Sequence, residues 1–230
     1  MIAIEAASDP EILREVHRTL LTPSFRPGEL LTEKDFLAQF PHEAEALLAR
    51  DEEGRMLGAA VSEQGGSVVL LQYLAAAPAV RGRSIGSLLL RAVLDRWVAD
   101  PAVNVVLAEL DRPDAHAPHP LHGDPSARLR FYERFDALAL ELPYFQPSIA
   151  AGAEREHGML LAAFDLDGSL RERGRLSSAQ SAAVRDYLLQ ALQGARDPEA
   201  MRLLDAAEAP GGIGVRSLAC YEQIPVSRRC

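Results

Sequence analysis

The chain has 230 residues, of which 48% are hydrophobic and 25% are charged, a composition typical of a soluble globular protein. Its formal net charge of −9 argues against a broad nucleic-acid-binding surface and mildly favours a cationic substrate. No apolar run approaches the ~20 residues of a membrane helix, and the N-terminus has neither the basic region nor the long apolar region of a signal peptide.

The first 75 residues are predicted to form a strand, two helices and three further strands. Asp9 can cap the first helix, with Pro10 in its first turn, and Thr32 can cap the second. Short apolar runs separated by turn residues mark the strands. The expected elements span residues 2–6, 10–21, 32–40, 44–50, 56–63 and 67–75.

A long helix is predicted from Ile85 to about Val98, because apolar residues recur there at helical spacing. The apolar positions that we assign to it are Leu88, Leu89, Ala92, Val93 and Val98. A buried type of strand, a loop rich in proline and histidine, a helix, two strands and two amphipathic helices complete the chain. Their expected ranges are 103–110, 112–125, 126–135, 137–142, 158–164, 177–192 and 197–207.

The turn before the long helix carries basic residues and glycines in the order Arg81-Gly82-Arg83-Ser84-Ile85-Gly86. The first backbone N–H groups of a helix have no partner inside it, and the helix dipole adds partial positive charge there. Glycine also lets an anion approach the backbone closely. The turn therefore predicts a phosphate site, although an ordinary strand–helix turn can have a similar sequence.

This turn resembles the phosphate-binding motif of the GCN5-related N-acetyltransferase (GNAT) superfamily, (Gln/Arg)-x-x-Gly-x-(Gly/Ala). Ser84 occupies the position of a family glycine, and a serine held there at positive φ costs on the order of 1 kcal/mol. The order of elements is similar to the family core over about residues 1–164. Residues 142–147, Leu-Pro-Tyr-Phe-Gln-Pro, resemble a bacterial subgroup of undefined substrate.

The resemblance implies a mixed α/β (α+β) fold. Its central sheet is mixed but mostly antiparallel, is splayed at the cofactor cleft and is flanked by helices. We expect an acetyltransferase core over residues 1–165 and a helical C-terminal extension over residues 166–230. Acetyl-CoA is the implied co-substrate, with its pyrophosphate on residues 81–86. The pantetheine arm would pair with Leu74, Ala75 and Ala76 as an added strand does.

The resemblance also implies the residues of the chemistry. Glu109, near the end of a strand, would be the base that removes a proton from the acceptor amine, and Asp111 is a weaker substitute. Tyr132 lies in a segment, residues 124–135, that resembles the second motif of the family, and it would face the thiolate of departing CoA. Both residues also have structural readings, Glu109 as a strand-end charge and Tyr132 as a core aromatic.

Tyr144 and Phe25 are the residues that we expect to line the acceptor pocket. Phe25 lies in the loop over residues 22–30, which borders the acceptor site in the family, and Tyr144 follows the strand predicted over residues 137–142. The alternative for the loop is a simple connector in which Phe25 packs into the core, and the alternative for Tyr144 is a purely structural role.

Three other motifs are weighed against this interpretation. His116, His119 and His122 are spaced by three, but the prolines around them prevent a helix from aligning the rings, so we expect no metal and favour a mobile flap. Residues 160–169 resemble the nucleophile motif of haloacid dehalogenase-type phosphatases, yet no lysine follows Lys34, and we interpret the segment as a turn. Residues 211–214 are interpreted as a loop.

We therefore expect an enzyme that moves an acetyl group from acetyl-CoA to a small-molecule amine by direct attack on the thioester, without a metal. The main alternative is a non-catalytic module of the same fold that binds CoA or acyl-CoA, and another is a protein-interaction role for the helical tail. Nucleic acid and membrane are not expected partners, and the chain is compatible with a homodimer. Its two cysteines, Cys220 and Cys230, make no disulfide framework, which fits a cytoplasmic location.

Overall fold

The computed structural model describes residues 2–149 and 154–227. The chain divides into two compact units, one made of Met1–Gly65 and Val69–Pro101 and the other of Gly66–Val68 and Ala102–Cys230. Both units combine helices with strands, most of which pair antiparallel. The fold class predicted from the sequence, a mixed α/β protein with mostly antiparallel strands flanked by helices, is confirmed.

In the first unit, the strands follow one another in space in chain order, β1-β2-β3-β4. The pairs β1/β2 and β2/β3 are antiparallel. The expected caps form, because the Asp9 side chain accepts from the Glu11 N–H and the Thr32 hydroxyl accepts from the Asp35 N–H. The elements are β1 (Ala3–Ala7), α1 (Pro10–Val16), the π-helical turn η1 (His17–Leu21), α2 (Glu33–Ala38), β2 (Ala44–Arg50), β3 (Met56–Gly65), β4 (Val68–Ala76), the 3-10 turn η2 (Pro78–Val80) and α3 (Ile85–Val98).

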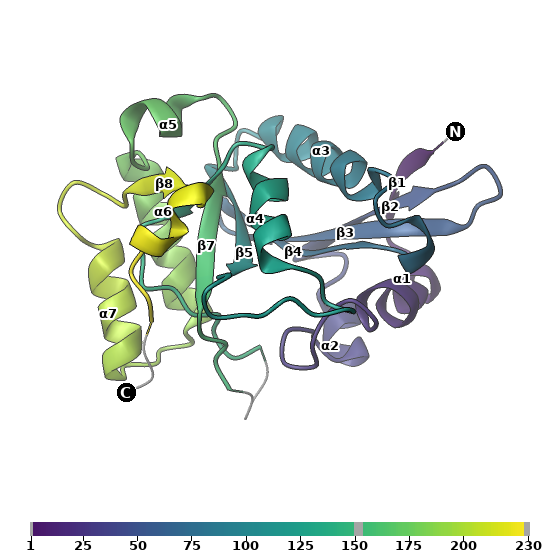
Figure 1. Cartoon of the computed structure of the whole chain (residues 1–230), viewed down its shortest axis with the longest axis horizontal. Coiled ribbons are helices and arrows are strands. Elements are labelled where there is room, and N and C mark those ends of the chain that lie inside the picture. The colour runs from purple at the N-terminus through teal and green to yellow at the C-terminus, as the bar shows by residue number, and fades with distance from the viewer. Residues whose placement is uncertain (1, 150–153, 228–230) are drawn as a thin grey trace. The chain divides into compact units, whose positions relative to one another are not determined.

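Side-chain alternation along β3 separates the two helical layers of this unit. Ala59 and Val61 pack into an apolar cluster with residues of α1, η1 and α2. Gly58 and Ser62 face α3 instead, where Ser62 accepts a hydrogen bond from the indole of Trp97 at 3.1 Å. The helices therefore lie on opposite faces of these strands, α3 on one and α1 with α2 on the other (Figure 1).

The buried face of α3 differs in part from the one predicted, because Leu89 and Val93 are buried as expected but two other assigned residues are not. Leu88 and Val98, which we assigned to the apolar stripe, are 43% and 55% exposed. The leucines around position 88 can belong to either of two neighbouring apolar faces of the helix. The structure buries the face that begins at Ile85. Its members are Ile85, Leu89, Leu90, Val93, Leu94 and Trp97.

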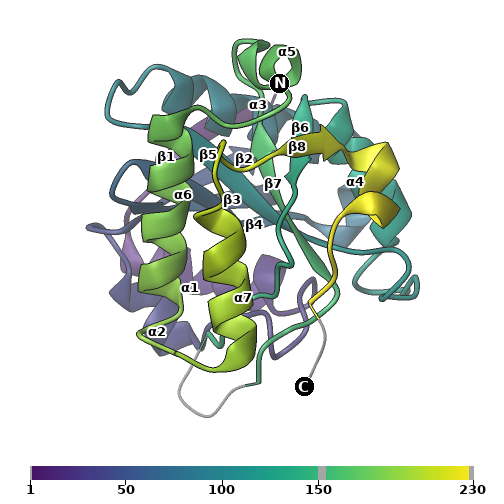
Figure 2. The same cartoon turned by 90° about the vertical axis from the view of Figure 1, so that its left-hand side faces the viewer.

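In the second unit, the strands lie in the order β5-β7-β6-β8, and each neighbouring pair is antiparallel. Helix α4 packs near β5 and β6, while α6 packs on β5 and beside α7, so the two helices cover opposite faces (Figures 1 and 2). The elements are β5 (Val105–Asp111), α4 (Pro125–Glu133), β6 (Ala137–Leu140), β7 (Met159–Phe164), α5 (Ser169–Arg173), α6 (Ser178–Ala191), α7 (Pro198–Ala207), β8 (Val215–Ser217) and the 3-10 segment η3 (Leu218–Gln223).

The C-terminal segment contains more than the two amphipathic helices predicted for it. Strand β8 pairs with β6, with Ala139 opposite Arg216, so the segment also adds a strand to the second unit. The second unit includes residues before and after position 165, where we expected a domain boundary. Cys220 is a free thiol, and Cys230 lies outside the described residues.

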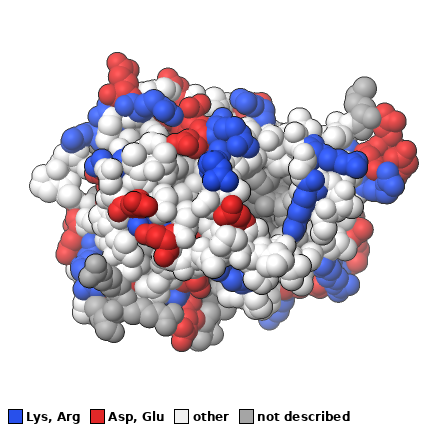
Figure 3. Space-filling model, viewed as in Figure 1, with Lys and Arg blue, Asp and Glu red and all other residues white. Residues whose placement is uncertain are grey.

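Basic side chains are interspersed with acidic ones on the face of the molecule that Figure 3 shows. Each helix in the described part of the chain is too short or too polar to cross a bilayer.

Candidate active site

The turn at residues 81–86 follows η2 and opens α3, as the sequence predicted. Ser84 is the N-cap of α3 and adopts left-handed backbone angles (φ 63°, ψ 11°), and Gly82 also has positive φ, at 81°. The Arg83 N–H is used inside the turn, where it donates to the Val80 carbonyl at 3.1 Å. The Arg81 N–H similarly donates to Pro78 at 3.4 Å. Two of the six amides in the turn are therefore already occupied.

The remaining amides of the turn fit an anion. Ile85 and Gly86 begin α3, where an N–H has no intrahelical acceptor. Among the described residues, none accepts a hydrogen bond from the N–H of Gly82, Ser84, Ile85 or Gly86. A left-handed residue directly before a helix turns successive N–H groups toward one side, which is the arrangement of a phosphate-binding nest.

Replacing Ser84 with glycine is expected to raise the free energy of unfolding by about 1 kcal/mol, because glycine adopts positive φ without steric cost. Chemical denaturation of the two proteins measures the difference. Ser87→Gly, three residues on and inside α3, is the matched control and should lower stability by about 0.5–1 kcal/mol. Equal effects of the two substitutions would contradict the assignment of strain to position 84.

The residues expected to pair with pantetheine lie at the end of β4. Ala75 is buried in the apolar cluster of the first unit, while Leu74 and Ala76 are partly exposed. Just beyond the strand, the Ala77 N–H donates to the Leu57 carbonyl at 2.8 Å, so the chain still follows β3 here. The pantetheine contact itself stays a prediction.

Phe25 packs against the aromatic part of the same cluster. Its ring meets Tyr73 edge-on with 5.1 Å between centroids, and the Tyr73 hydroxyl accepts a hydrogen bond from the Leu31 N–H at 3.1 Å. Phe25 therefore anchors the loop between η1 and α2, which fits the packed-connector alternative, and its contact with an acceptor stays a prediction.

Glu109 is held by two side chains from the segment after β6. The Tyr144 hydroxyl donates to Glu109 Oε1, and the Gln146 amide nitrogen donates to Oε2 at 2.9 Å. Burial and the neighbouring charge of Glu109 raise the pKa of Tyr144 well above its ordinary value, so the phenol keeps its proton and acts as the donor. Both carboxylate oxygens of Glu109 therefore accept a hydrogen bond, and the orientation of the group is fixed.

Tyr132 lies in the last turn of α4 and is 8% exposed. Its ring packs against Phe131 and Phe164, with centroids 5.2 and 6.0 Å away. Burial raises the pKa of Tyr132 to about 12, an effect that Arg128 opposes. The phenol is therefore protonated at neutral pH and can donate a hydrogen bond, although its proton is harder to remove than that of an ordinary tyrosine.

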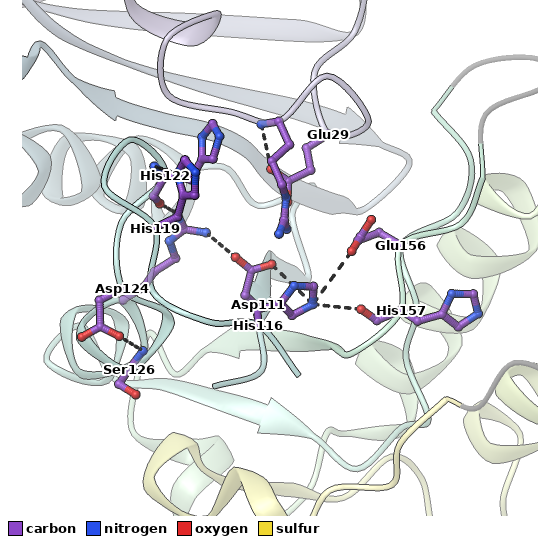
Figure 4. A network of polar contacts seen from close by, with 11 residues as sticks. Glu29, Asp111, His116, His119, His122, Asp124, Ser126, Glu156 and His157 are labelled. Carbon is purple, nitrogen blue, oxygen red and sulfur yellow. Dashed lines mark hydrogen bonds and ion pairs between the residues drawn. The ribbon is translucent and has the colours of Figure 1, made fainter. Parts of the chain in front are cut away.

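Asp111, the weaker substitute base, belongs to a different network (Figure 4). Arg128 Nη1 lies 3.3 Å from its carboxylate, and His116 Nε2 lies 3.9 Å away. His116 lies between Asp111 and Glu156 and is also hydrogen-bonded to the His157 carbonyl at 2.9 Å. The carboxylate of Asp111 is thus paired with Arg128, and His116 lies near it.

The other motifs have structural roles in the described residues. The rings of His119 and His122 stack at 4.5 Å, and no group of three or more potential metal ligands occurs in the part of the chain that the structure describes. Asp165, in the phosphatase-like segment, accepts hydrogen bonds from the backbone of Leu170 and Arg171, and so it shapes the turn into α5.

The family model for acetyltransferases, described as the acetyltransferase (GNAT) family, matches residues 13–136. The chain belongs to the GNAT family. A putative GNAT-family acetyltransferase from Bacteroides thetaiotaomicron has a similar structure at 16% identity, with a TM-score of 0.60 over 84% of this chain and 99% of that one. The loading GNATL domain of CurA from Lyngbya majuscula is also similar in structure, at 18% identity. Its TM-score is 0.52 over 72% of this chain and 98% of that one.

The ribosomal-protein-S18-alanine N-acetyltransferase from Escherichia coli is similar at 17% identity and a TM-score of 0.50, over 71% of this chain and 93% of that one. At these identities the similarities to solved structures establish the fold alone. No curated protein matches the chain by sequence.

Sequence reasoning missed the partners of Glu109 in this GNAT chain. Tyr144 was assigned to the acceptor pocket, but its hydroxyl is used on Glu109, and Gln146 was not assigned a role at all. The available signal was their spacing, because residues two apart in an extended segment point to the same side. Both lie after residue 136, where the family match ends.

Proposed function

We propose that this GNAT-family chain is an N-acetyltransferase that moves an acetyl group from acetyl-CoA to the amine of a small molecule. The observation that chiefly supports this is the Glu109 carboxylate, which Tyr144 and Gln146 hold in one orientation through hydrogen bonds to both of its oxygens. A partly buried, oriented carboxylate is a suitable base for an ammonium group. The unoccupied amides of the turn at 81–86 fit the pyrophosphate of acetyl-CoA.

In the proposed reaction, the acceptor ammonium gives one proton to Glu109, and the nitrogen of the resulting neutral amine forms a bond to the acetyl carbon. The carbon–sulfur bond breaks, its electron pair passes to the sulfur as the thiolate, and the second proton leaves the nitrogen for solvent, which yields the neutral amide. Tyr132 would hydrogen-bond to that thiolate rather than transfer its proton fully, because its pKa of about 12 lies well above that of a thiol. The route uses direct attack and no covalent enzyme intermediate.

The remaining expectations form part of the same proposal. We place the acetyltransferase core in residues 1–165, with residues 166–230 as its extension, and expect the protein in a bacterial cytoplasm. The acidic net charge of −9 favours a cationic amine over nucleic acid as partner. The S18-alanine acetyltransferase named above acts on a protein amine, so the size of the acceptor is the part of the proposal that a substrate panel must decide.

Tyr132→Phe is expected to lower the turnover number by about 10- to 100-fold, the value of one hydrogen bond to a charged group. Thiol release across a panel of primary amines measures turnover, and the rise in Tm with acetyl-CoA concentration measures binding. The affinity for acetyl-CoA should be unchanged in the variant. If the wild-type protein binds acetyl-CoA but acetylates no amine, the non-catalytic module is the better assignment.

A further inference from the structure

The segment that holds Glu109 is itself fixed from its opposite side. Phe145 lies between Tyr144 and Gln146 in sequence and is completely buried. Its ring stacks on His157, with centroids 5.9 Å apart and an interplanar angle of 25°. The guanidinium of Arg155 lies 4.6 Å from the centre of the same ring. Since neighbouring residues of an extended chain point to opposite sides, any shift of Phe145 moves both donors to Glu109.

The backbone reinforces this attachment. The Gln146 N–H donates to the Glu156 carbonyl at 2.9 Å, and the Glu156 N–H donates back at 3.1 Å. This reciprocal pair makes a short antiparallel bridge between the segment with Phe145 and the segment with Arg155 and His157. The two segments therefore move as one piece.

The N-terminus of α7 binds the second of these segments through two carboxylates. Arg155 makes a forked ion pair with Asp197, the N-cap of the helix, at 2.8 and 2.6 Å. Glu199, which is 9% exposed, accepts from Arg155 at 3.2 Å and lies 2.9 Å from His157 Nε2. The Arg155 guanidinium holds the pKa of Asp197 below its usual range. Negative charge is also favoured at a helix N-terminus.

From this continuous set of contacts, we infer that the N-terminus of α7 positions the Glu109 carboxylate, acting through Arg155, His157 and Phe145. The inference rests on the proposed function, because it takes Glu109 as the base. The residues that link Glu109 to α7 all lie after residue 136, beyond the match to the GNAT model, so the device is built from the C-terminal part of the chain. It gives the C-terminal segment a part in catalysis without contact to the substrate.

The expected effect follows from how closely a catalytic group must be held. A base needs to stay within about 0.5 Å of its working position, and a displacement of about 1 Å can cost 100-fold in rate. Removing the charge of Glu199 leaves His157 and Arg155 with a weaker partner. The imidazole of His157 and the guanidinium of Arg155, which lie against Phe145, then have more freedom, and so do the two donors to Glu109.

Glu199→Gln tests the inference, with Glu208→Gln as the matched control. Glu208 lies at the other end of α7, where it pairs with Arg185 at 2.5 Å on the surface and has no link to Phe145. For the full-length Glu199→Gln protein we expect about a 10-fold fall in kcat, with the acceptor KM and the Kd for acetyl-CoA within about twofold of wild type. The control should match wild type in all three values.

A second readout needs no turnover. The side-chain amide signal of Gln146 in ¹H–¹⁵N spectra, identified by its loss in Gln146→Met, should shift in Glu199→Gln and stay in place in Glu208→Gln. If Glu199→Gln fails to fold, Arg155→Lys replaces it, because lysine keeps the charge but loses the fork. The inference is overturned if the Glu199→Gln protein has the same kcat and the same Gln146 amide signal as the Glu208→Gln control. A wild-type protein that transfers nothing overturns the proposed function instead, while the amide signal still decides whether α7 reaches Gln146.

Discussion

Replacing Glu109 with glutamine should lower the turnover number for amine acetylation by about 100- to 1,000-fold, since an amide cannot take a proton from the acceptor. The affinity for acetyl-CoA should stay the same, because the amides of the turn at 81–86 are untouched. Steady-state thiol release gives kcat, and acetyl-CoA titrations of Tm give relative affinity. The loss should be present at every pH at which the wild type is active.

The fold should survive this substitution because the site can re-pair its hydrogen bonds. The amide oxygen of Gln146 is buried and has no partner, while its nitrogen donates to Glu109. A half-turn of the Gln146 amide would present that oxygen to the new NH₂ group at position 109. The hydroxyl of Tyr144 could still donate to the remaining oxygen. We therefore expect a change in unfolding free energy of less than about 1 kcal/mol.

Glu141→Gln is the control for losing one negative charge from the same unit. Glu141 follows β6 and pairs with Arg216 from β8, away from the contacts of Glu109. Its turnover should equal that of the wild type. Turnover of Glu109→Gln within about threefold of the control would remove Glu109 from the mechanism and leave a water chain as the route for the proton.

Local features of this chain are visible in its sequence because their hydrogen bonds span few residues. Asp9 and Thr32 cap their helices as predicted, with acceptor and donor two or three residues apart. Ser84 shows positive φ where the family has glycine. For the two caps, the residue type and its distance from the next apolar run are enough to specify the geometry. The positive φ of Ser84 follows instead from its place in the family motif.

Contacts between residues that are far apart in the chain cannot be predicted from local sequence in this way. Tyr144 reaches Glu109 across 35 positions, and Arg155 reaches Asp197 across 42. Which side chains meet depends on strand order, and β7 lies between β5 and β6 although it follows both in sequence. A single sequence therefore predicted that Glu109 ends a strand but not what holds it. The same limit applies to β8, whose three residues gain their strand character from pairing with β6.

Gly58→Ala should lower the free energy of unfolding by about 2–3 kcal/mol, the usual cost of forcing an extra carbon into a packed core. A Cβ at this position would lie 2.7 Å from the Ala75 carbonyl oxygen and 2.9 Å from Ile85 Cγ2. The first neighbour is backbone, so it cannot yield by changing rotamer. The measurement is denaturant unfolding, and Gly58→Val should be more severe because it adds two further carbons.

The same substitution also tests where acetyl-CoA binds. The two atoms that must move belong to Ala75 and Ile85, which we expect to contact pantetheine and pyrophosphate respectively. Gly58→Ala should therefore weaken acetyl-CoA binding by about 10-fold even at temperatures where it remains folded. Gly28→Ala is the control, because nothing lies within 4 Å of its added carbon and both stability and affinity should be unchanged. A destabilised Gly58→Ala protein with full affinity would show that the end of β4 and the start of α3 do not form the cofactor site.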